Sequence, residues 1–230
     1  MPPRLAWVFI TAAAVLVATT TAVSHAGPRH RFCVSSIHGR FDSDQRGDSA
    51  VVFSTRRKCD TMEGRYWYLV VRLANGRALS RPLGHDRPAF SSAREVGCEA
   101  VCEVRAAPDF NRDGRHEIEV SLQQGASSEQ RGVYGVVRGK LRRLPGGRAG
   151  ARFSLDYGGT VRFGSYVVCR ARAKEHYVVA VGWGITDNTH ITAVQEDSYR
   201  FDGVRFRFSG THSKRIRTAG LPPRVPGRTC

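Results

Sequence analysis

Three short turns that contain glycine constrain the fold of this chain more than any other feature of its sequence. They are Asn75-Gly76, Arg138-Gly139 and Asp202-Gly203. Each turn separates two short runs of β-branched and aromatic residues, and a turn of this kind between alternating apolar strands is a strong short-range signal for a β-hairpin. Helical periodicity is scarce along the chain, so the sequence predicts an all-β protein.

The three hairpins recur in segments that share one plan, in which an apolar strand and a variable loop precede the hairpin. The expected strands are 50–53, 67–73 and 77–80, then 117–122, 133–137 and 140–144, then 177–181, 197–201 and 204–208. A lead-in strand before each segment, at 34–37, 101–106 and 166–170, would complete four antiparallel strands, which is the size of a propeller blade. The sequence thus predicts a β-propeller-like array of about three blades. Its units would span about 33–84, 98–145 and 150–210, with a loose tail at 211–230.

The first 26 residues have the pattern of a secretory signal peptide. Arg4 is the only charge before an apolar run from Leu5 to Val17, and Ser24-His25-Ala26 places small residues at the cleavage positions. The run is short for a membrane span of about 20 residues, so we expect cleavage after Ala26 rather than retention as an anchor. No later stretch is apolar enough to cross a bilayer. The mature chain, 27–230, is therefore expected to be a single secreted domain.

Six cysteines follow this segment, and their number favours disulfide bonds. They are Cys33, Cys59, Cys98, Cys102, Cys169 and Cys230. An even number of cysteines in an exported chain is typical of a disulfide framework. A zinc site is the alternative, but Cys98-x-x-x-Cys102 has no second Cys or His pair at matching spacing. We expect all six to be bonded and Cys230 to hold the tail, while the other pairings stay open.

The chain is strongly basic, with a formal net charge of +16 at neutral pH. Only four of its 36 basic residues are lysines, and the arginines are scattered through the expected strands and loops. Such a field attracts anionic polymers without specificity. Scattered charge does not indicate a dedicated nucleic-acid site, so we expect no specific nucleic-acid partner.

The loop 109–117 is the sharpest local signal for chemistry. Oxygen-bearing side chains stand at its positions one, three, five and nine: Asp109, Asn111, Asp113 and Glu117. Arg115 at position seven would add its backbone carbonyl, and Gly114 permits the sharp turn that a calcium ion needs around it. Position twelve is Val120 and the flanks are expected strands, which excludes an EF-hand. A plain Asp/Asn/Gly turn without metal is the alternative.

A second copy of this loop precedes the first unit. When Asp48 is placed at position nine, Asp42 and Asp44 fall at positions three and five. Arg40 at position one and Gln45 at position six depart from the pattern, so this copy is expected to be degenerate and the weaker calcium site. In the loop 109–117, His116 is expected to point outward.

Two segments of the chain resemble FG-GAP/VCBS repeats, which build the β-propeller of integrin α-chains and occur in many secreted bacterial proteins. They are Gly-x-Phe-Asp-x-Asp-x-x-x-Asp before Ala-Val-Val-Phe, and Ala-Pro-Asp-Phe-Asn-x-Asp-Gly-x-x-Glu-Ile. The resemblance covers about 37–145, and 150–210 only through the layout of its hairpin. It implies calcium bound by Asp109, Asn111, Asp113 and Glu117, with the Arg115 carbonyl. Propellers close with about four or more blades, so three units imply an open array, a miniature or self-association.

From these signals we expect a non-enzymatic, calcium-ordered binding or structural module at or outside a bacterial envelope. Its partner would be an extracellular protein or an anionic polymer. The chain has no Gly-x-Ser-x-Gly or His-Glu-x-x-His motif. Two alternatives stay open. A pocket of convergent polar groups away from 109–117 would favour an extracellular hydrolase, and arginines clustered on one face would favour a cationic protein that binds wall polymers, nucleic acid or anionic lipid.

Overall fold

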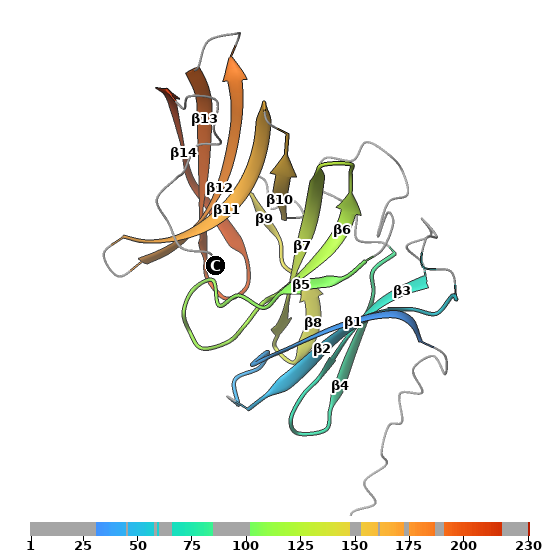
Figure 1. The fold of residues 1–230 in the computed structure, drawn as a ribbon. Coiled ribbons are helices and arrows are strands. Elements are labelled where there is room, and N and C mark those ends of the chain that lie inside the picture. Colours follow the sequence, from blue (N-terminus) through green and yellow to red (C-terminus); the bar gives the residue numbers. More distant parts are fainter. Residues whose placement is uncertain are drawn as a thin grey trace, which may run out of the picture.

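The chain folds into fourteen β-strands and no helix within the residues that the computed structural model describes, which confirms the all-β prediction (Figure 1). These residues are 31–44, 46–57, 59, 66–84, 102–147, 153–160, 162–172, 175–186, 191–217 and 230. The expected signal peptide, 1–26, lies outside them. A search of the described part of the chain for a helix that could span a membrane finds none.

The first predicted unit is a four-stranded antiparallel sheet, with its strands in chain order. They are β1 (Phe32–Gly39), β2 (Asp48–Ser54), β3 (Trp67–Arg72) and β4 (Ala78–Pro82). The two inner strands are rich in Val, Phe and Leu and are the more buried ones. The turn between β3 and β4 holds Gly76 at φ 85°, a backbone conformation that glycine adopts without strain.

The second and third units have the same strand order and also contain their predicted lead-in strands. The second consists of β5 (Val104–Ala106), β6 (Ile118–Gln124), β7 (Ser128–Val137) and β8 (Lys140–Arg143). The third consists of β11 (Phe163–Arg172), β12 (Glu175–Thr186), β13 (Ile191–Phe201) and β14 (Phe206–Arg217). Neighbouring strands in both units are antiparallel. The predicted hairpins are therefore present.

The second and third units do not form separate sheets, contrary to the prediction of three independent blades. β10 (Ser154–Gly159) pairs with β7 on one side and β11 on the other, so that one ten-stranded sheet results. The cause is the length of β7, whose second half pairs with β8 while its first half remains free for β10. The short β9 (Gly146–Gly147) pairs with β14. A second correction concerns the tail, because residues 211–217 belong to β14.

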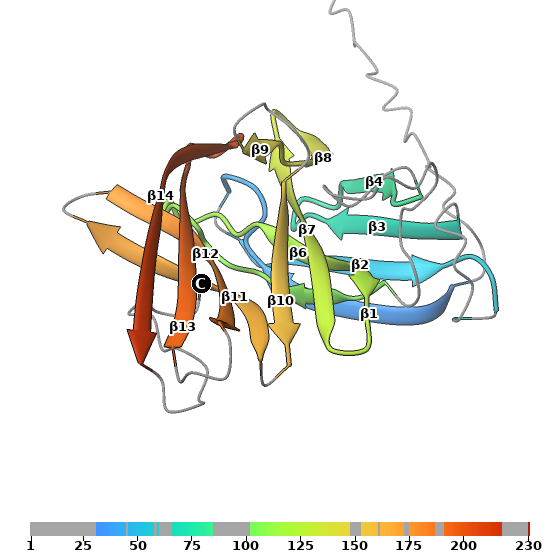
Figure 2. The ribbon, with the colours of Figure 1, turned by 90° about the horizontal axis from the view of Figure 1, so that it is seen from above.

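The first sheet packs face to face on the second unit (Figure 2). β1 lies against β5 and β4 against β8, so equivalent strands of the two units face each other. Their shared apolar core contains Phe41, Val52, Trp67, Leu69, Val71, Ile118, Val120, Leu122 and Tyr134. The two sheets therefore bury one continuous core.

A second apolar core joins the second unit to the third. It is built around four phenylalanines: Phe110, Phe153, Phe201 and Phe206. The ring of Phe206 stacks on that of Phe153, with 4.1 Å between centroids, and meets that of Phe110 edge-on at 5.3 Å. Phe110 lies in the predicted calcium loop, so this loop also anchors the second unit against the third.

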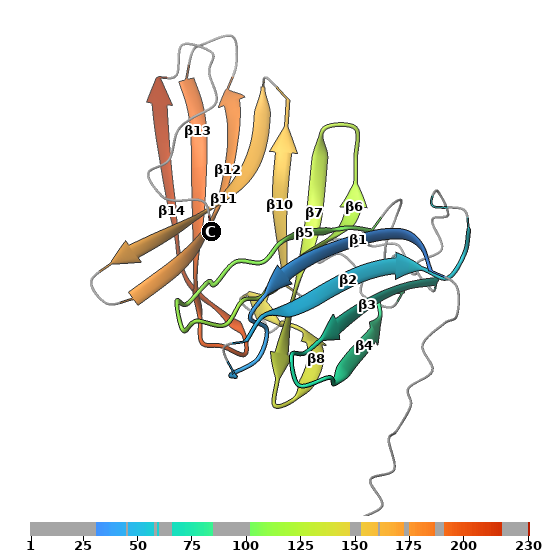
Figure 3. The same cartoon turned by 60° about the horizontal axis from the view of Figure 1, so that its bottom comes forward.

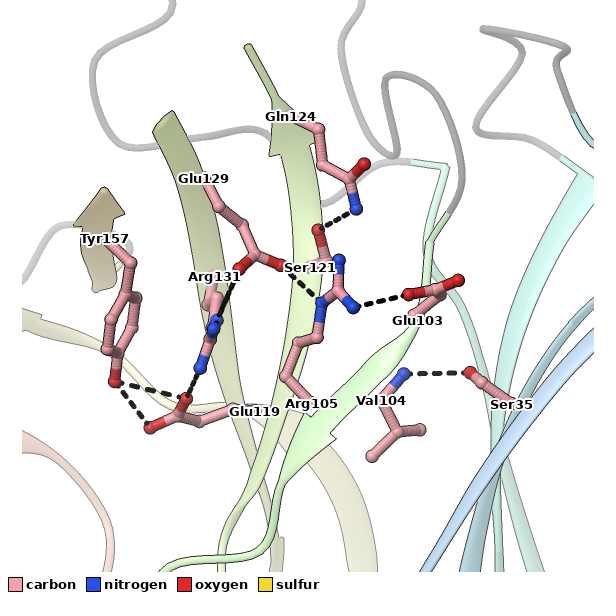
Figure 4. A network of polar contacts seen from close by, with 10 residues as sticks. All are labelled: Ser35, Glu103, Val104, Arg105, Glu119, Ser121, Gln124, Glu129, Arg131 and Tyr157. Atoms are coloured by element: carbon pink, nitrogen blue, oxygen red, sulfur yellow. Dashed lines mark hydrogen bonds and ion pairs between the residues drawn. The ribbon is translucent and has the colours of Figure 1, made fainter. Parts of the chain in front are cut away.

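Because both faces of β6 are covered, one of them buries polar side chains (Figure 4). Glu119 is 2% exposed. Its carboxylate accepts a hydrogen bond from Arg131 Nη1 at 2.9 Å and a bifurcated one from the Tyr157 hydroxyl, which lies 3.1 and 3.2 Å from the two carboxylate oxygens. Arg131 also binds Glu129 at 2.8 Å and lies over the Tyr157 ring. This network connects β6, β7 and β10.

The described cysteines are all disulfide-bonded. Cys33 bonds to Cys59, and Cys169 on β11 bonds to Cys230, with Cα atoms 5.7 and 5.0 Å apart. The expectation that Cys230 holds the C-terminal end is therefore confirmed. Cys102 is bonded as well, whereas Cys98 lies outside the described residues.

Candidate metal centre

The two predicted calcium loops, 40–48 and 109–117, share three internal hydrogen bonds. In the first, the Phe41 amide donates to Asp48 Oδ2 at 2.7 Å, and in the second the Phe110 amide donates to Glu117 Oε2 at 3.3 Å. The acid at position nine thus accepts from the amide at position two in both loops. Both phenylalanines are buried, one in each core.

Positions three and five are equivalent too. The Asp44 amide donates to Asp42 Oδ1 at 3.0 Å, as the Asp113 amide donates to Asn111 Oδ1 at 3.4 Å. The acid at position five then accepts from the amide two residues later in each loop, at 2.9 Å. These Asx turns coil the backbone so that the side-chain oxygens point to the inside of the loop. The alignment made from the sequence is therefore confirmed by the geometry.

The loops are joined by two hydrogen bonds between Arg40 and His116. The Arg40 amide donates to His116 Nδ1 at 3.0 Å, and the His116 amide donates to the Arg40 carbonyl at 2.7 Å. The expectation that His116 points outward is wrong, because the lead-in of the first loop runs beside the second and its amide needs an acceptor. The two loops therefore form one structural element at the junction of the two units.

The first loop brings its three carboxylates together. Asp42, Asp44 and Asp48 each offer an oxygen, and these oxygens all lie within 4.8 Å of one another. Burial raises the pKa of Asp42, and the negative charges of the other two raise it further. Asp48 is buried and also accepts a hydrogen bond at Oδ1 from the Ala74 amide, at 2.8 Å. The cluster is thus tied to the β3–β4 turn and carries negative charge that a cation would neutralise.

The second loop contains a cation of its own, the guanidinium of Arg115. Its Nε and Nη2 lie 3.1 and 2.5 Å from Asp113 Oδ2. Burial opposes ionisation of Asp113, but the hydrogen bonds from Arg115 outweigh it and lower the pKa of this carboxyl. Asp109 is occupied by backbone amides, because it accepts from Asp113 at 3.1 Å and from Gly114 at 2.9 Å. Backbone amides and the Arg115 guanidinium therefore occupy the carboxylate oxygens of Asp109 and Asp113.

The remaining acid of the second loop is the most perturbed. Burial raises the pKa of Glu117 to about 8, and the negative charges of Asp113 and Asp109 add to this. The third unit also reaches this loop, since a Cβ at Gly203 would lie 3.2 Å from Arg115 Nη2. A metal in the second loop would have to displace Arg115 from Asp113.

The residues of the first loop fit a calcium ion better than those of the second. Calcium prefers carboxylate and carbonyl oxygens, and three carboxylates converge at Asp42, Asp44 and Asp48. The sequence ranked the loops in the opposite order, because Arg40 and Gln45 depart from the motif. It also missed the side chain of Arg115 and assigned only its carbonyl. Asp113 and Arg115 stand two residues apart in the sequence, and this spacing could have indicated their ion pair.

Comparison of the chain with protein-family models, with curated proteins and with solved structures finds no match. A function is therefore inferred from the geometry of the loops and of the sheets that carry them.

Proposed function

We propose that this chain is a secreted, non-enzymatic binding or structural module of the FG-GAP/VCBS type, ordered by calcium at the first loop. The observation that carries the proposal is the convergence of Asp42, Asp44 and Asp48 within 4.8 Å. Three carboxylates at this separation repel one another, and a divalent cation removes that repulsion. The disulfides, which are typical of extracellular proteins, support export.

Calcium, when bound, supplies positive charge to the loop. Hydrogen bonds of the loop would transmit its ordering to neighbouring elements. Asp48 links the loop to the β3–β4 turn through the Ala74 amide. Arg40, at the start of the same loop, is bound to His116 of the second loop. Ordering the first loop would therefore fix the junction between the first two units. The first two units would be consecutive blades of a propeller-like array, and the shared sheet would continue it into the third unit.

The second loop is the lower-affinity site in this proposal. Its ligands would be Asp109, Asn111, Asp113 and Glu117, with the Arg115 carbonyl, as the resemblance implies. Arg115 holds Asp113 in the absence of metal, so occupation would require that ion pair to open. An extracellular protein or an anionic polymer remains the expected partner.

Calorimetric titration of the chelator-treated protein with calcium tests the proposal. We expect weak, extracellular-type binding, with a Kd on the order of 10⁻⁴ to 10⁻³ M, and a higher melting temperature in millimolar calcium. Identical melting curves in calcium and in chelator would contradict the calcium assignment. Magnesium is the control cation, because its preference for a rigid octahedral shell disfavours a flexible acidic loop.

The hydrolase alternative is favoured by one observation, a cavity with convergent polar groups away from 109–117. Its volume is about 700 Å³, and two carboxylates, Asp156 and Asp197, are among its lining residues. Glycoside hydrolysis uses two carboxylates about 5–9.5 Å apart, whereas these two stand on β10 and β13, with β11 and β12 between them, so only one of them could act on a given bond. Release of new reducing ends from an oligosaccharide, lost in Asp156→Asn, would support this second candidate. Intact oligosaccharide after prolonged incubation would remove it.

A further inference from the structure

Two glycines in the interior of β12 have no explanation in the fold itself. Gly182 and Gly184 lie in a ladder whose register with β11 and β13 is unbroken, so neither marks a bulge. Neither has a positive φ, and a Cβ at Gly182 would meet nothing within 4 Å. Glycine weakens a strand, and where no bulge or bend requires it, it often marks the close approach of a ligand or another backbone.

The glycines belong to a floor of small side chains on one face of the ten-stranded sheet. In register, Ser165 and Gln195 flank Gly182, and Phe163 and Ala193 flank Gly184. This floor lines the cavity of about 700 Å³, and a neighbouring cavity of about 480 Å³ shares Asp156, Ser165, Gly182 and Trp183 with it. We name the two together the small-residue groove.

The small-residue groove is long enough for an extended ligand. Its lining residues come from β6, β7, β10, β11, β12, β13 and β14. These strands stand side by side in Figure 3. With about 4.8 Å between neighbouring strands, these seven strands span about 29 Å.

Two carboxylates along the groove, Asp156 and Asp197, accept hydrogen bonds from neutral donors, whereas Glu129 is paired with Arg105 and Arg131. Asp156 Oδ1 accepts from Gln130 Nε2 at 2.8 Å, and Gln130 Oε1 is buried without a hydrogen-bond partner in the described part of the chain. Asp197 accepts from Thr211 Oγ1 at 2.6 Å and from Gln195 Nε2 at 3.3 Å. The carboxylates of Asp156 and Asp197 have lone pairs beyond these bonds, which suit a ligand rich in hydrogen-bond donors.

The charge of the protein decides which donor-rich ligand fits. A cationic ligand would be repelled by the net charge of +16 and by Arg215, which lines the same cavity. An anionic ligand would meet Asp156 and Asp197. Hydroxyl groups are neutral and can donate to carboxylates while they accept from a guanidinium. We propose that the small-residue groove binds a neutral oligosaccharide, laid along the glycine floor of β12.

This inference goes beyond the calcium module, since the groove and the calcium loops are built from different residues, but it shares its cavity with the hydrolase alternative. If the protein binds sugar but calcium does not stabilise it, only the calcium proposal is contradicted. Calcium-dependent stabilisation without sugar binding would contradict the groove proposal alone. Each measurement is therefore made on the full chain in calcium and in chelator.

Isothermal titration calorimetry with chitohexaose, cellohexaose and maltohexaose at millimolar concentration tests the groove. We expect one of them to bind, and Gly182→Phe to weaken that binding by about tenfold or more, because the new ring fills the floor. Gly210→Phe is the matched control, because a Cβ there also meets nothing within 4 Å and Gly210 lines another cavity. It should bind as the parent does.

Three outcomes would overturn the groove proposal. They are binding of none of the three sugars, sugar binding unaffected by Gly182→Phe, and saturable binding of spermine that the same substitution removes. Thermal unfolding of both variants guards against misfolding, and Asp156→Asn provides a second variant that leaves the floor unfilled. We expect Asp156→Asn to weaken sugar binding without a change in the melting temperature of more than a few degrees.

Discussion

Arg40 and His116 bind each other in both directions, since the Arg40 amide donates to His116 Nδ1 at 3.0 Å and the His116 amide donates to the Arg40 carbonyl at 2.7 Å. They stand 76 residues apart in the chain. The pair connects the two calcium-type loops, and only its imidazole half depends on a side chain. This makes the coupling of the first two units accessible to mutation.

His116→Ala should destabilise the fold by about 1–2 kcal/mol, because the part-buried Arg40 amide loses its acceptor. His116→Asn, which retains a side-chain acceptor, should recover part of the loss. Urea unfolding measures both, with His38→Ala as the control because His38 is exposed on β1. Equal stability of His116→Ala and His38→Ala would show that the two loops are not coupled through this contact.

Asp44→Ala should abolish the stabilisation that calcium gives. Asp44 is exposed and is one of the three clustered acids, so its removal takes away a ligand without opening the core. At a calcium concentration a hundredfold above Kd, linkage gives about 2.7 kcal/mol of stabilisation. Melting temperatures in calcium and in chelator measure it. Ser43→Ala, at an exposed position of the same loop, should respond to calcium as the parent does; an unchanged response in Asp44→Ala would place the ion elsewhere.

Arg115→Ala should convert the second loop into a better calcium site. The substitution removes the guanidinium that holds Asp113 and leaves the backbone carbonyl at position seven. We expect the calcium stoichiometry measured by calorimetry to rise by one site. Arg112→Ala is the control, since Arg112 is an exposed arginine of the same loop. An unchanged stoichiometry in Arg115→Ala would mean that the closed loop, and not its arginine, excludes the metal.

Glu117 should make the metal-free protein less stable as the pH rises. Burial raises the pKa of Glu117 to about 8 in the folded state, against about 4.3 for an unperturbed glutamate. The folded state therefore holds the proton more tightly, so its stabilising contribution is complete below about pH 4 and is lost progressively up to about pH 8.

Glu117→Gln should flatten this part of the pH dependence, by up to a few kcal/mol between the two limits. Unfolding by urea at several pH values in chelator measures the difference between the two proteins, and groups common to both cancel. Parallel stability curves for Glu117→Gln and the parent would show that Glu117 ionises normally.

The sequence predicted most of the strands and the equivalence of the loops because both depend on local chemistry. The turn glycines Gly76, Gly139 and Gly203 need a positive φ, and all three have one. Asx turns likewise require only residues two positions apart. The two buried phenylalanines, Phe41 and Phe110, follow the same register in each loop, so the repeat is visible in a single chain.

What the sequence did not predict depends on pairing between distant residues. β10 is short, contains Gly158 and Gly159, and becomes a strand because β7 offers it an unpaired half. The half of β7 that pairs with β10 is the half that β8 leaves unpaired, and the residues of β10 alone do not indicate this pairing. The role of Gly182 is equally hidden, because an interior glycine has a meaning only when the space around it is known. Local patterns therefore predicted the units but not the sheet that merges two of them.

The Glu119 carboxylate connects β6 to β10 through the Tyr157 hydroxyl and to β7 through Arg131. Burial raises the pKa of Glu119, although hydrogen bonds from Arg131 oppose the shift. Removing one partner of a buried pair is costly, although Arg131 keeps its second partner, Glu129, which limits the loss. Glu119→Gln should therefore destabilise the fold by about 2–4 kcal/mol, and Tyr157→Phe by about 1 kcal/mol.

The double variant distinguishes a network from two separate contacts. Tyr157 donates its hydroxyl to Glu119, so Tyr157→Phe should cost less once Glu119 is Gln, and the two losses should fall short of additivity by about 0.5 kcal/mol or more. Glu103→Gln, in a more exposed ion pair with Arg105, is the control and should cost less than about 1 kcal/mol. Additive losses in urea unfolding would mean that β6 and β10 are held together by backbone pairing through β7 and by apolar packing alone.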